Sequence, residues 1–494
     1  MKGYLRKTLE YGAGNLFNKL ILLLLLPLFT HRLQPEEYAV YTNLFVFIAF
    51  ASLVFFLGLQ QALFSYFNYQ KTPAYRFNLL SSIYITVTIT GLLFTFLICI
   101  YRVELSSLIL RDSSYQNLLI ITAFILLFDL YHGLTLVVLN NMEKSTLYVV
   151  LGMVKNIFFL VLIIIITLLG RFGIKEIFQV VLLSSFLSFL ISLIVIFKLL
   201  RFYCPEASAR RYYSFGLMRK VLSFGLIMIP GTLAMMILSI SDRYMLTYLS
   251  ARGLHDVGIY AIGYRIGMIM SFLTSLISRV YYPYAMKIAH AEGSVEKYRR
   301  MFDLYIVTGC ILGTLVLVYT PEIFHLFIAP SYQEGIKIVF CGVISIFLLG
   351  IFNLINISFY IRQKAENIAL TVGSGAILNI ILNFLLIPRL GIYGAGLASI
   401  IAYLGIVIFN YLSAERLYKI GYNLKNMIIS LIILFMATSL NFVVPASNLI
   451  TAVKIILTIV IGFLFIGKIV KNHDIMEFLK AYLTGRTQYE IQDR

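Results

Sequence analysis

The chain has 494 residues, of which 60% are hydrophobic and 13% are charged. Charged residues make up about a quarter of an ordinary soluble protein, so this composition excludes a water-soluble fold. The net charge of +18 is typical of nucleic-acid-binding proteins, but such binding needs a soluble basic face, and we expect no nucleic-acid partner. The composition predicts a protein with many membrane-spanning helices.

The sequence contains no motif typical of a metal-binding or nucleotide-binding site. The four cysteines and six histidines form no CxxC, HxxxH or HxH pair, so we expect no metal site and no cofactor. The run Gly462–Lys468 fits GxxxxGK, but Ile469 stands where a Ser or Thr must bind magnesium, and the run is apolar. We therefore predict a protein that is not an enzyme and hydrolyses no nucleotide.

Apolar runs of bilayer length predict an all-α integral membrane protein with about fourteen transmembrane helices. The first run follows a basic N-terminus but lacks a small-residue cleavage site, so we interpret it as a retained span. The spans are expected near residues 12–29, 38–59, 79–100, 116–139, 147–168, 177–197, 222–247, 257–283, 302–320, 336–359, 367–387, 392–412, 425–443 and 448–468. The connections between them are short, so function is expected inside the bilayer.

The two halves of the sequence resemble each other. Pro27 and the pair Pro230-Gly231 interrupt helices in corresponding positions, and we predict that they act as structural hinges. We expect two six-helix lobes related by a pseudo-twofold repeat, followed by a final helix pair. The predicted parts are an N-terminal lobe at 1–200, a cytoplasmic basic linker at 201–220, a C-terminal lobe at 221–415, helices 13 and 14 at 416–470, and a cytoplasmic tail at 471–494.

Basic residues are distributed unevenly between alternate loops. If the N-terminus is cytoplasmic, the cytoplasmic loops carry about three times as many Lys and Arg residues as the outer loops. The positive-inside rule therefore predicts an even number of spans with both termini in the cytoplasm. Most of the net charge is explained by this topology signal.

A few ionisable residues fall inside the predicted spans. Each costs at least about 2.5–3.5 kcal/mol at membrane depth and so needs water, a partner or a route to the interface. We interpret the cations as the lining of a central cavity that favours an anionic passenger such as a phosphate or diphosphate. They are Lys19, Lys155, Arg265 and Arg279.

Each of these cations also has a plainer interpretation. Lys155 is within reach of pairing with Asp129 on the neighbouring helix, and Arg279 is close enough to a helix end to extend to the interface, as is Lys454. The adjacent residues Asp242 and Arg243 are interpreted as a local structural pair.

Asp129 and His132 lie three residues apart and share a helix face, so they are candidates for coupling to H+ or Na+. The alternative is that Asp129 is a fixed counter-ion and His132 a hydrogen-bonded packing residue. The first helix contains Asn15, Asn18 and Lys19 but no carboxylate, which argues against an exporter of cationic drugs.

Four segments near the N-terminus and three later ones carry a resemblance to a known family. They are Gly14-Asn15-Leu16-x-x-Lys19-Leu20, Leu26-Pro27-Leu28, Leu33-x-Pro35-Glu36-Glu37-Tyr38-x-x-Tyr41, Leu57-Gly58-Leu59-x-x-Ala62-Leu63, Ser241–Leu246, Val257–Tyr260 and Leu390–Ala395. The combination resembles the polysaccharide synthesis transporter family, the O-antigen type oligosaccharide-lipid flippases of the multidrug/oligosaccharidyl-lipid/polysaccharide exporter superfamily.

The resemblance implies a function in the bacterial inner membrane. A polyprenyl-diphosphate-linked oligosaccharide would be moved from the cytoplasmic to the outer leaflet by alternating access between two lobes. Membrane lipids and a polysaccharide polymerase machinery are the implied partners. Lys19 is the best match to the family's cationic residues, and Arg265 fits such a role by its position in the eighth helix. The glycan is left open. The alternatives are an ion-coupled drug exporter of the same superfamily and, from another class, a membrane-embedded glycan polymerase, which would need larger outer loops.

Overall fold

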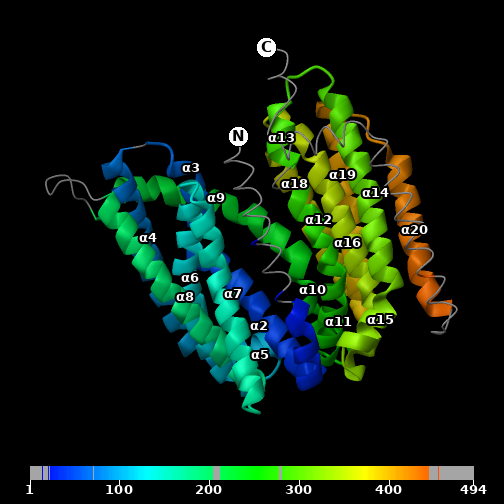
Figure 1. Cartoon of the computed structure of the whole chain (residues 1–494), viewed down its shortest axis with the longest axis horizontal. Coiled ribbons are helices and arrows are strands. Elements are labelled where there is room, and N and C mark those ends of the chain that lie inside the picture. The colour runs from blue at the N-terminus through cyan, green and yellow to red at the C-terminus, as the bar shows by residue number, and fades with distance from the viewer. Residues whose placement is uncertain are drawn as a thin grey trace. The chain divides into compact units, whose positions relative to one another are not determined.

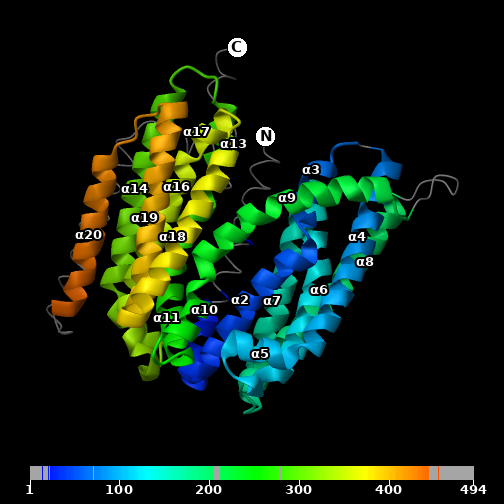
Figure 2. The same ribbon diagram turned by 180° about the vertical axis from the view of Figure 1, so that it is seen from behind.

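The computed structural model describes residues 14, 21, 23–70, 72–203, 212–277, 281–443 and 454. Every regular element in this part of the chain is a helix, which confirms the predicted all-α class. The chain packs as two compact units, an N-terminal unit, Gly14–Gly258, and a C-terminal unit that contains all described residues from Ile259 onward. Figures 1 and 2 show the helices of each unit from opposite sides.

The N-terminal unit begins with a helical stretch at residues 23–32. Its further elements are α2 (Pro35–Phe56), α3 (Leu59–Tyr66), α4 (Pro73–Ile100), α5 (Arg102–Leu110), η1 (Ser113–Tyr115), α6 (Gln116–Asn141), α7 (Ser145–Leu168), α8 (Ile174–Phe202), α9 (Phe215–Ile240) and α10 (Asp242–Leu249). Helix α6 packs against α8, α4 and α7, so it lies at the centre of this bundle.

The C-terminal unit begins within α11 (Leu254–Gly267). Its further elements are η3 (Met268–Met270), α12 (Ser271–Leu276), α13 (Tyr282–Lys287), α14 (Ser294–Val318), α15 (Thr320–Phe327), η5 (Pro330–Gly335), α16 (Ile336–Ile355), α17 (Ile357–Ile361), α18 (Glu366–Leu390), α19 (Ile392–Leu417) and α20 (Leu424–Val443). Helix α16 is buried on nearly all sides, as expected for a helix that is hydrophobic all round.

Eleven helices in the described residues are long and apolar enough to cross a membrane, so the chain is a multi-pass membrane protein. They match the eleven predicted spans between residues 38 and 412. Helix α20 matches the span predicted at 425–443, and most of the spans predicted at 12–29 and 448–468 lies outside the described residues. The full count of fourteen stays a prediction.

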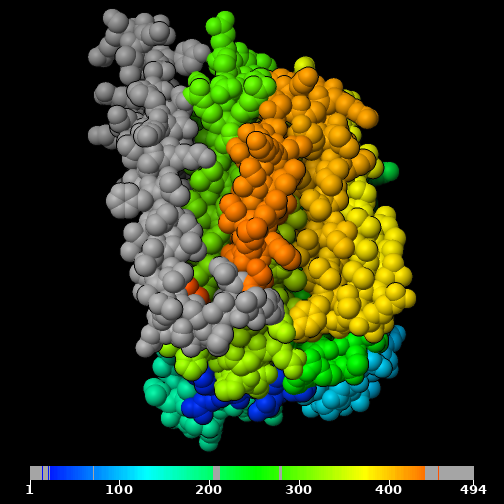
Figure 3. All heavy atoms as spheres, turned by 90° about the vertical axis from the view of Figure 1, so that its right-hand side faces the viewer, coloured from blue at the N-terminus to red at the C-terminus, as the bar shows by residue number. Residues whose placement is uncertain are grey.

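The outer surface of the C-terminal unit is apolar along α20. Figure 3 shows α20, in orange, on this surface, and α20 packs against α14 and α16. Several of its large apolar side chains are exposed, among them Ile428, Ile432 and Met436. Such a face is expected where a helix meets lipid rather than water.

Local sequence explains where several helices begin. Pro35 and Pro73 occupy the first position of α2 and α4, where the missing N–H has no helical partner to lose. The Glu37 carboxylate accepts a hydrogen bond from the Gln34 N–H at 3.1 Å, and the Thr72 hydroxyl accepts one from the Tyr75 N–H at 3.4 Å. These caps satisfy backbone donors that the first helical turn leaves free.

The sequence predicts one continuous span at 38–59, but the structure has two helices there, α2 and α3. Leu57 and Gly58 both have left-handed backbone angles, with φ of 49° and 71°, and they separate α2 from α3. A side chain at Gly58 would overlap the carbonyl of Gly225 on α9, so the backbones of the two segments touch here. Only glycine fits this approach.

Two later spans also differ from their predicted extents. The span at 222–247 ends as α9 at Ile240, and α10 follows as a separate helix. The span at 257–283 changes from α11 to the 3-10 turn η3 and then to α12. Hydrophobicity alone locates such segments but does not show where the helix breaks.

The predicted hinges lie within helices. Pro27 stands in the helical stretch at residues 23–32, and its carbonyl accepts hydrogen bonds from the side chains of Thr30 and His31 at 3.1 and 2.8 Å. Helix α9 continues through Pro230 and Gly231, and Figure 2 shows α9 as a bent ribbon. A proline inside a helix removes one backbone hydrogen bond and is a common cause of bending. Hinge motion at these residues stays a prediction.

The compact units divide the chain differently from the predicted lobes. Helix α9 packs against α2, α3 and α4, so packing places it with the N-terminal unit, whereas the repeat pattern places residues 221–415 in the second lobe. Packing and sequence repeats are different criteria. The lobe boundaries therefore stay a prediction.

Candidate functional site

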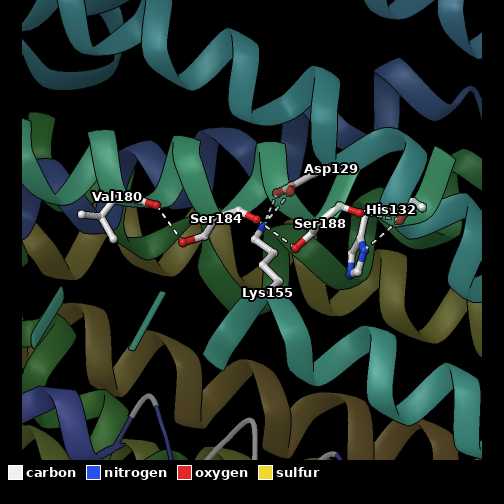
Figure 4. Close-up of polar contacts among 7 residues, drawn as sticks. Asp129, His132, Lys155, Val180, Ser184 and Ser188 are labelled. Carbon is white, nitrogen blue, oxygen red and sulfur yellow. Dashed lines mark hydrogen bonds and ion pairs between the residues drawn. The ribbon is translucent and has the colours of Figure 1, made fainter. Parts of the chain in front are cut away.

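The centre of the candidate site is an ion pair between α6 and α7 (Figure 4). The Lys155 Nζ donates to both carboxylate oxygens of Asp129, at 2.7 Å to Oδ1 and 2.6 Å to Oδ2. The structure thus brings together the two residues that the sequence placed on neighbouring spans. This is the pairing that we considered for Lys155 as an alternative to a free cavity cation.

The depth of this pair follows from helix geometry. Asp129 lies twelve residues before Asn141, the last residue of α6, and Lys155 lies ten residues after Ser145, the first residue of α7. At 1.5 Å per residue, the pair is about 15–18 Å from the α6–α7 turn. Since the hydrocarbon core is about 30 Å thick, the two charges lie near the middle of the membrane-spanning segments.

The pair is not sealed inside the protein. The side chain of Lys155 is 23% exposed and that of Asp129 is 26% exposed. Charges in contact with lipid tails at this depth would be costly. We therefore expect this face of α6 and α7 to meet water or a polar ligand.

Polar character continues along the same face of α6. Gly133 follows Asp129 by one helical turn, and a Cβ atom at this position would lie 3.0 Å from the Gln60 Nε2 and 3.2 Å from the Phe56 ring. The absence of a side chain at Gly133 lets α3 present an amide close to α6. The sequence pattern did not single out Gln60.

His132 points to a different partner. Its Nδ1 lies 3.3 Å from the Ser192 hydroxyl on α8, and its side chain is buried. The Ser192 hydroxyl donates its proton to the Ser188 carbonyl at 2.8 Å, so it can only accept from His132. This assigns the proton to Nδ1 when the imidazole is neutral. The alternative interpretation describes such a hydrogen-bonded His132, and the coupling role stays a prediction.

A serine ladder on α8 completes this network (Figure 4). Ser184, Ser188 and Ser192 each donate to the carbonyl four residues earlier, all at 2.8 Å. The three serines are fully buried, and the ladder satisfies their hydroxyls within one helix. Their spacing of four residues in an apolar helix is a sequence signal that we did not use.

Aromatic side chains line another part of α6. Phe128 packs against Phe186 and Phe189 of α8, with ring centroids 5.2 and 5.1 Å apart. Tyr131 stacks on Tyr84 of α4 at 6.2 Å. Such offset contacts add to the area buried between helices. They fix the position of α6, and hence of Asp129, against α4 and α8.

Another ion pair of the N-terminal unit lies at the junction of α9 and α10. The Arg243 Nη1 is 3.1 Å from the Asp242 Oδ1 and 3.4 Å from the Ser239 carbonyl. The exposed fractions of the Arg243 and Asp242 side chains are only 8% and 4%. This geometry agrees with the local structural pair expected from sequence.

The remaining predicted cations are distributed as follows. Arg265 is half-buried on α11 and belongs to the C-terminal unit. Lys19 and Arg279 lie outside the described residues. Lys454 donates to the Glu322 Oε1 of α15 at 2.7 Å, so its charge is neutralised within the C-terminal unit. A cavity lined by Lys19, Lys155, Arg265 and Arg279 therefore stays a prediction from the sequence.

Metal ligands do not gather anywhere in the part of the chain that the structure describes: no group of three or more His, Cys, Asp or Glu side chains has suitable geometry there.

Solved structures show which known fold this arrangement has. The chain is similar to a lipid II flippase, MurJ, in an inward closed conformation, with 15% identity and a TM-score of 0.73 over 94% of this chain and 99% of the other. It is also similar to a multidrug resistance MATE family transporter of the MOP superfamily in an inward-facing conformation, with 15% identity and a TM-score of 0.62 over 81% and 95% of the two chains. At these identities the likeness shows the fold.

Sequence comparison adds the family. No curated protein matches the sequence significantly. The model of the family described as "Polysaccharide biosynthesis protein" matches residues 4–289, which is more than half of the chain. The chain therefore belongs to the polysaccharide biosynthesis protein family, and it shares its fold with the MurJ and MATE structures.

Proposed function

We propose that the protein is a flippase, not an enzyme, that moves a polyprenyl-diphosphate-linked oligosaccharide from the inner to the outer leaflet of the bacterial cytoplasmic membrane by alternating access. Membership of the polysaccharide biosynthesis family and the fold shared with a lipid II flippase support this proposal. The observation that carries it is the position of Lys155, a cation near the middle of a span with a side chain that is 23% exposed.

The chemistry of a lipid-linked sugar explains why such a cation is useful. The diphosphate is the most strongly hydrated part of the passenger, and its transfer into the bilayer needs compensating charge. An ammonium group supplies a compact positive charge and up to three hydrogen bonds to phosphate oxygens. Arg265, Lys19 and Arg279 keep this role as predictions from sequence.

The proposed function does not depend on a coupling ion. The Asp129 carboxylate already has a cation as its partner, the Lys155 ammonium at 2.6 Å. His132 uses its Nδ1 proton for Ser192. Both observations favour packing and pairing over the coupling role that was an alternative in the sequence.

Deletion of the gene provides the direct test. We expect the deletion strain to lose the glycan from its outer surface and to accumulate the lipid-linked intermediate on the inner leaflet. The wild-type gene should restore export, whereas Lys155→Gln and Arg265→Gln should not, at equal amounts of folded protein in the membrane. Lys198→Gln, at an exposed position near the end of α8, is the matched control and should restore export.

Other outcomes identify the alternatives. Normal surface glycan without an accumulated intermediate would refute the proposal. A changed tolerance to cationic drugs with normal glycan would indicate an ion-coupled exporter. Arrival of single repeat units at the outer surface without polymer would indicate the polymerase, which in the proposed scheme is a separate partner.

A further inference from the structure

The contact between Lys155 and Asp129 resembles the contact that an ammonium group makes with a phosphate. Both carboxylate oxygens lie within 2.7 Å of the same Nζ. A phosphoryl group presents two oxygens to a lysine in a similar way. Asp129 therefore occupies the position on Lys155 that the proposed function gives to the diphosphate.

Asp129 and Lys155 are each other's hydrogen-bond partner. Within the described part of the chain, neither Asp129 nor Lys155 makes another hydrogen bond or ion pair through its side chain. A structural ion pair in a low-dielectric interior usually needs additional hydrogen bonds to offset the lost hydration. This pair has none, and it keeps about a quarter of each side chain exposed.

The surrounding polar groups are already engaged. The His132 Nδ1 is used by Ser192, and the hydroxyls of Ser184, Ser188 and Ser192 are used by carbonyls of α8. No rearrangement of this network is needed for Lys155 to change partners. Among the described side chains, the Asp129 carboxylate is the one that must move away from Lys155.

We propose that Asp129 is an internal substitute for the anionic head group: it neutralises Lys155 while the site is empty, gives way when a diphosphate arrives, and returns when the diphosphate leaves. This inference rests on the proposed function and deepens it. It makes Asp129 a residue that limits affinity and speeds release. A transporter requires both, because a passenger that is bound too tightly is not delivered.

Binding of inorganic pyrophosphate by the purified full-length protein tests this inference. In magnesium-free buffer, isothermal titration calorimetry should show tighter binding by Asp129→Asn than by the wild type. We expect a factor of about ten, since the variant removes one charge-assisted competitor for Lys155. Asp129→Glu retains a carboxylate and should bind like the wild type, and Lys198→Gln should change nothing.

Variants of Lys155 show whether the tighter pyrophosphate binding of Asp129→Asn depends on Lys155. Lys155→Gln should bind pyrophosphate weakly, and Asp129→Asn should give no gain in that background. In cells, Asp129→Asn should slow glycan export although it binds the anion more tightly. This combination of tighter binding and slower export is not expected from a merely structural pair.

Failure of the inference about Asp129 can be distinguished from failure of the proposed function. Equal or weaker binding by Asp129→Asn overturns the inference, as does failure of this variant to fold, because a substitute for the head group must be dispensable for folding. In either case, Lys155-dependent binding by the wild type would leave the proposed function standing. If the wild type binds no pyrophosphate and Lys155→Gln exports normally, both the inference and the proposed role of Lys155 are wrong.

Discussion

Two of the ion pairs in the N-terminal unit join a carboxylate to a cation in opposite surroundings. Asp242 and Arg243 are adjacent in sequence, almost fully buried, and held by the Ser239 carbonyl as well as by each other. Asp129 and Lys155 come from different helices, remain about a quarter exposed, and bind only one another among the described residues. The first pair stabilises the fold, whereas we expect the second pair to separate when Lys155 binds an anion.

The difference shows that distance alone is a poor guide to the role of an ion pair. The shorter contact, 2.6 Å between Lys155 and Asp129, belongs to the pair that we expect to exchange partners. Burial and additional hydrogen bonds decide how costly separation is, because they determine whether water can replace the lost partner. Four measurements test this ranking, from the largest expected effect to the smallest.

Removal of the buried cation should have the largest effect. Arg243→Ala removes the cation from the buried Asp242 carboxylate and should cost about 3–5 kcal/mol of stability. The thermal midpoint of the purified protein in detergent and the amount of folded protein in the membrane are the measurements. Arg243→Lys keeps the charge and should lose less. A midpoint equal to that of the wild type would contradict the structural role of this pair.

The hydrogen bond of His132 should come next. Ser192→Ala leaves the buried Nδ1–H without an acceptor and should cost about 1–3 kcal/mol, again measured as a lower thermal midpoint. The matched control is Ser188→Ala, which removes only a hydroxyl bonded to its own helix and should be nearly neutral. Equal losses in the two variants would show that His132 does not use Ser192.

The exposed pair should contribute less. A double-mutant cycle with Asp129→Asn and Lys155→Gln isolates the interaction between the two side chains. We expect a coupling free energy of about 1 kcal/mol or less, because water reaches both groups and screens them. A coupling of about 3 kcal/mol or more would place this pair in the same class as Asp242 and Arg243 and would remove the basis for partner exchange.

A surface pair defines the lower end of the scale. Glu296 and Arg300 lie four residues apart on α14, both side chains are exposed, and their atoms are 3.1 Å apart. Their coupling should be about 0.3–0.5 kcal/mol and should decrease with added salt. If this coupling exceeded that of Asp129 and Lys155, exposure would not explain the ranking.

Much of the fold could be predicted from sequence, because a span needs about twenty apolar residues and the hydropathy of each segment records this requirement directly. The ion pair could be anticipated for the same reason, since Lys155 and Asp129 are conspicuous in apolar helices. The helix break at Leu57-Gly58 could not, because it depends on left-handed backbone angles stabilised by packing against α9. The partner of His132 could not either, since it lies sixty residues away on a helix whose rotation the sequence does not fix.

The close approach of Gly58 to Gly225 determines which substitutions the protein tolerates at these two positions. In a library that replaces every residue in turn, these two positions should reject all substitutions, because any side chain would meet backbone that cannot move aside. Their neighbours Val54 and Leu226 are exposed and should accept many apolar residues. A selection for a functional protein should therefore find two positions, more than a hundred and sixty residues apart, that tolerate no substitution. These two positions lie where the start of α3 meets α9.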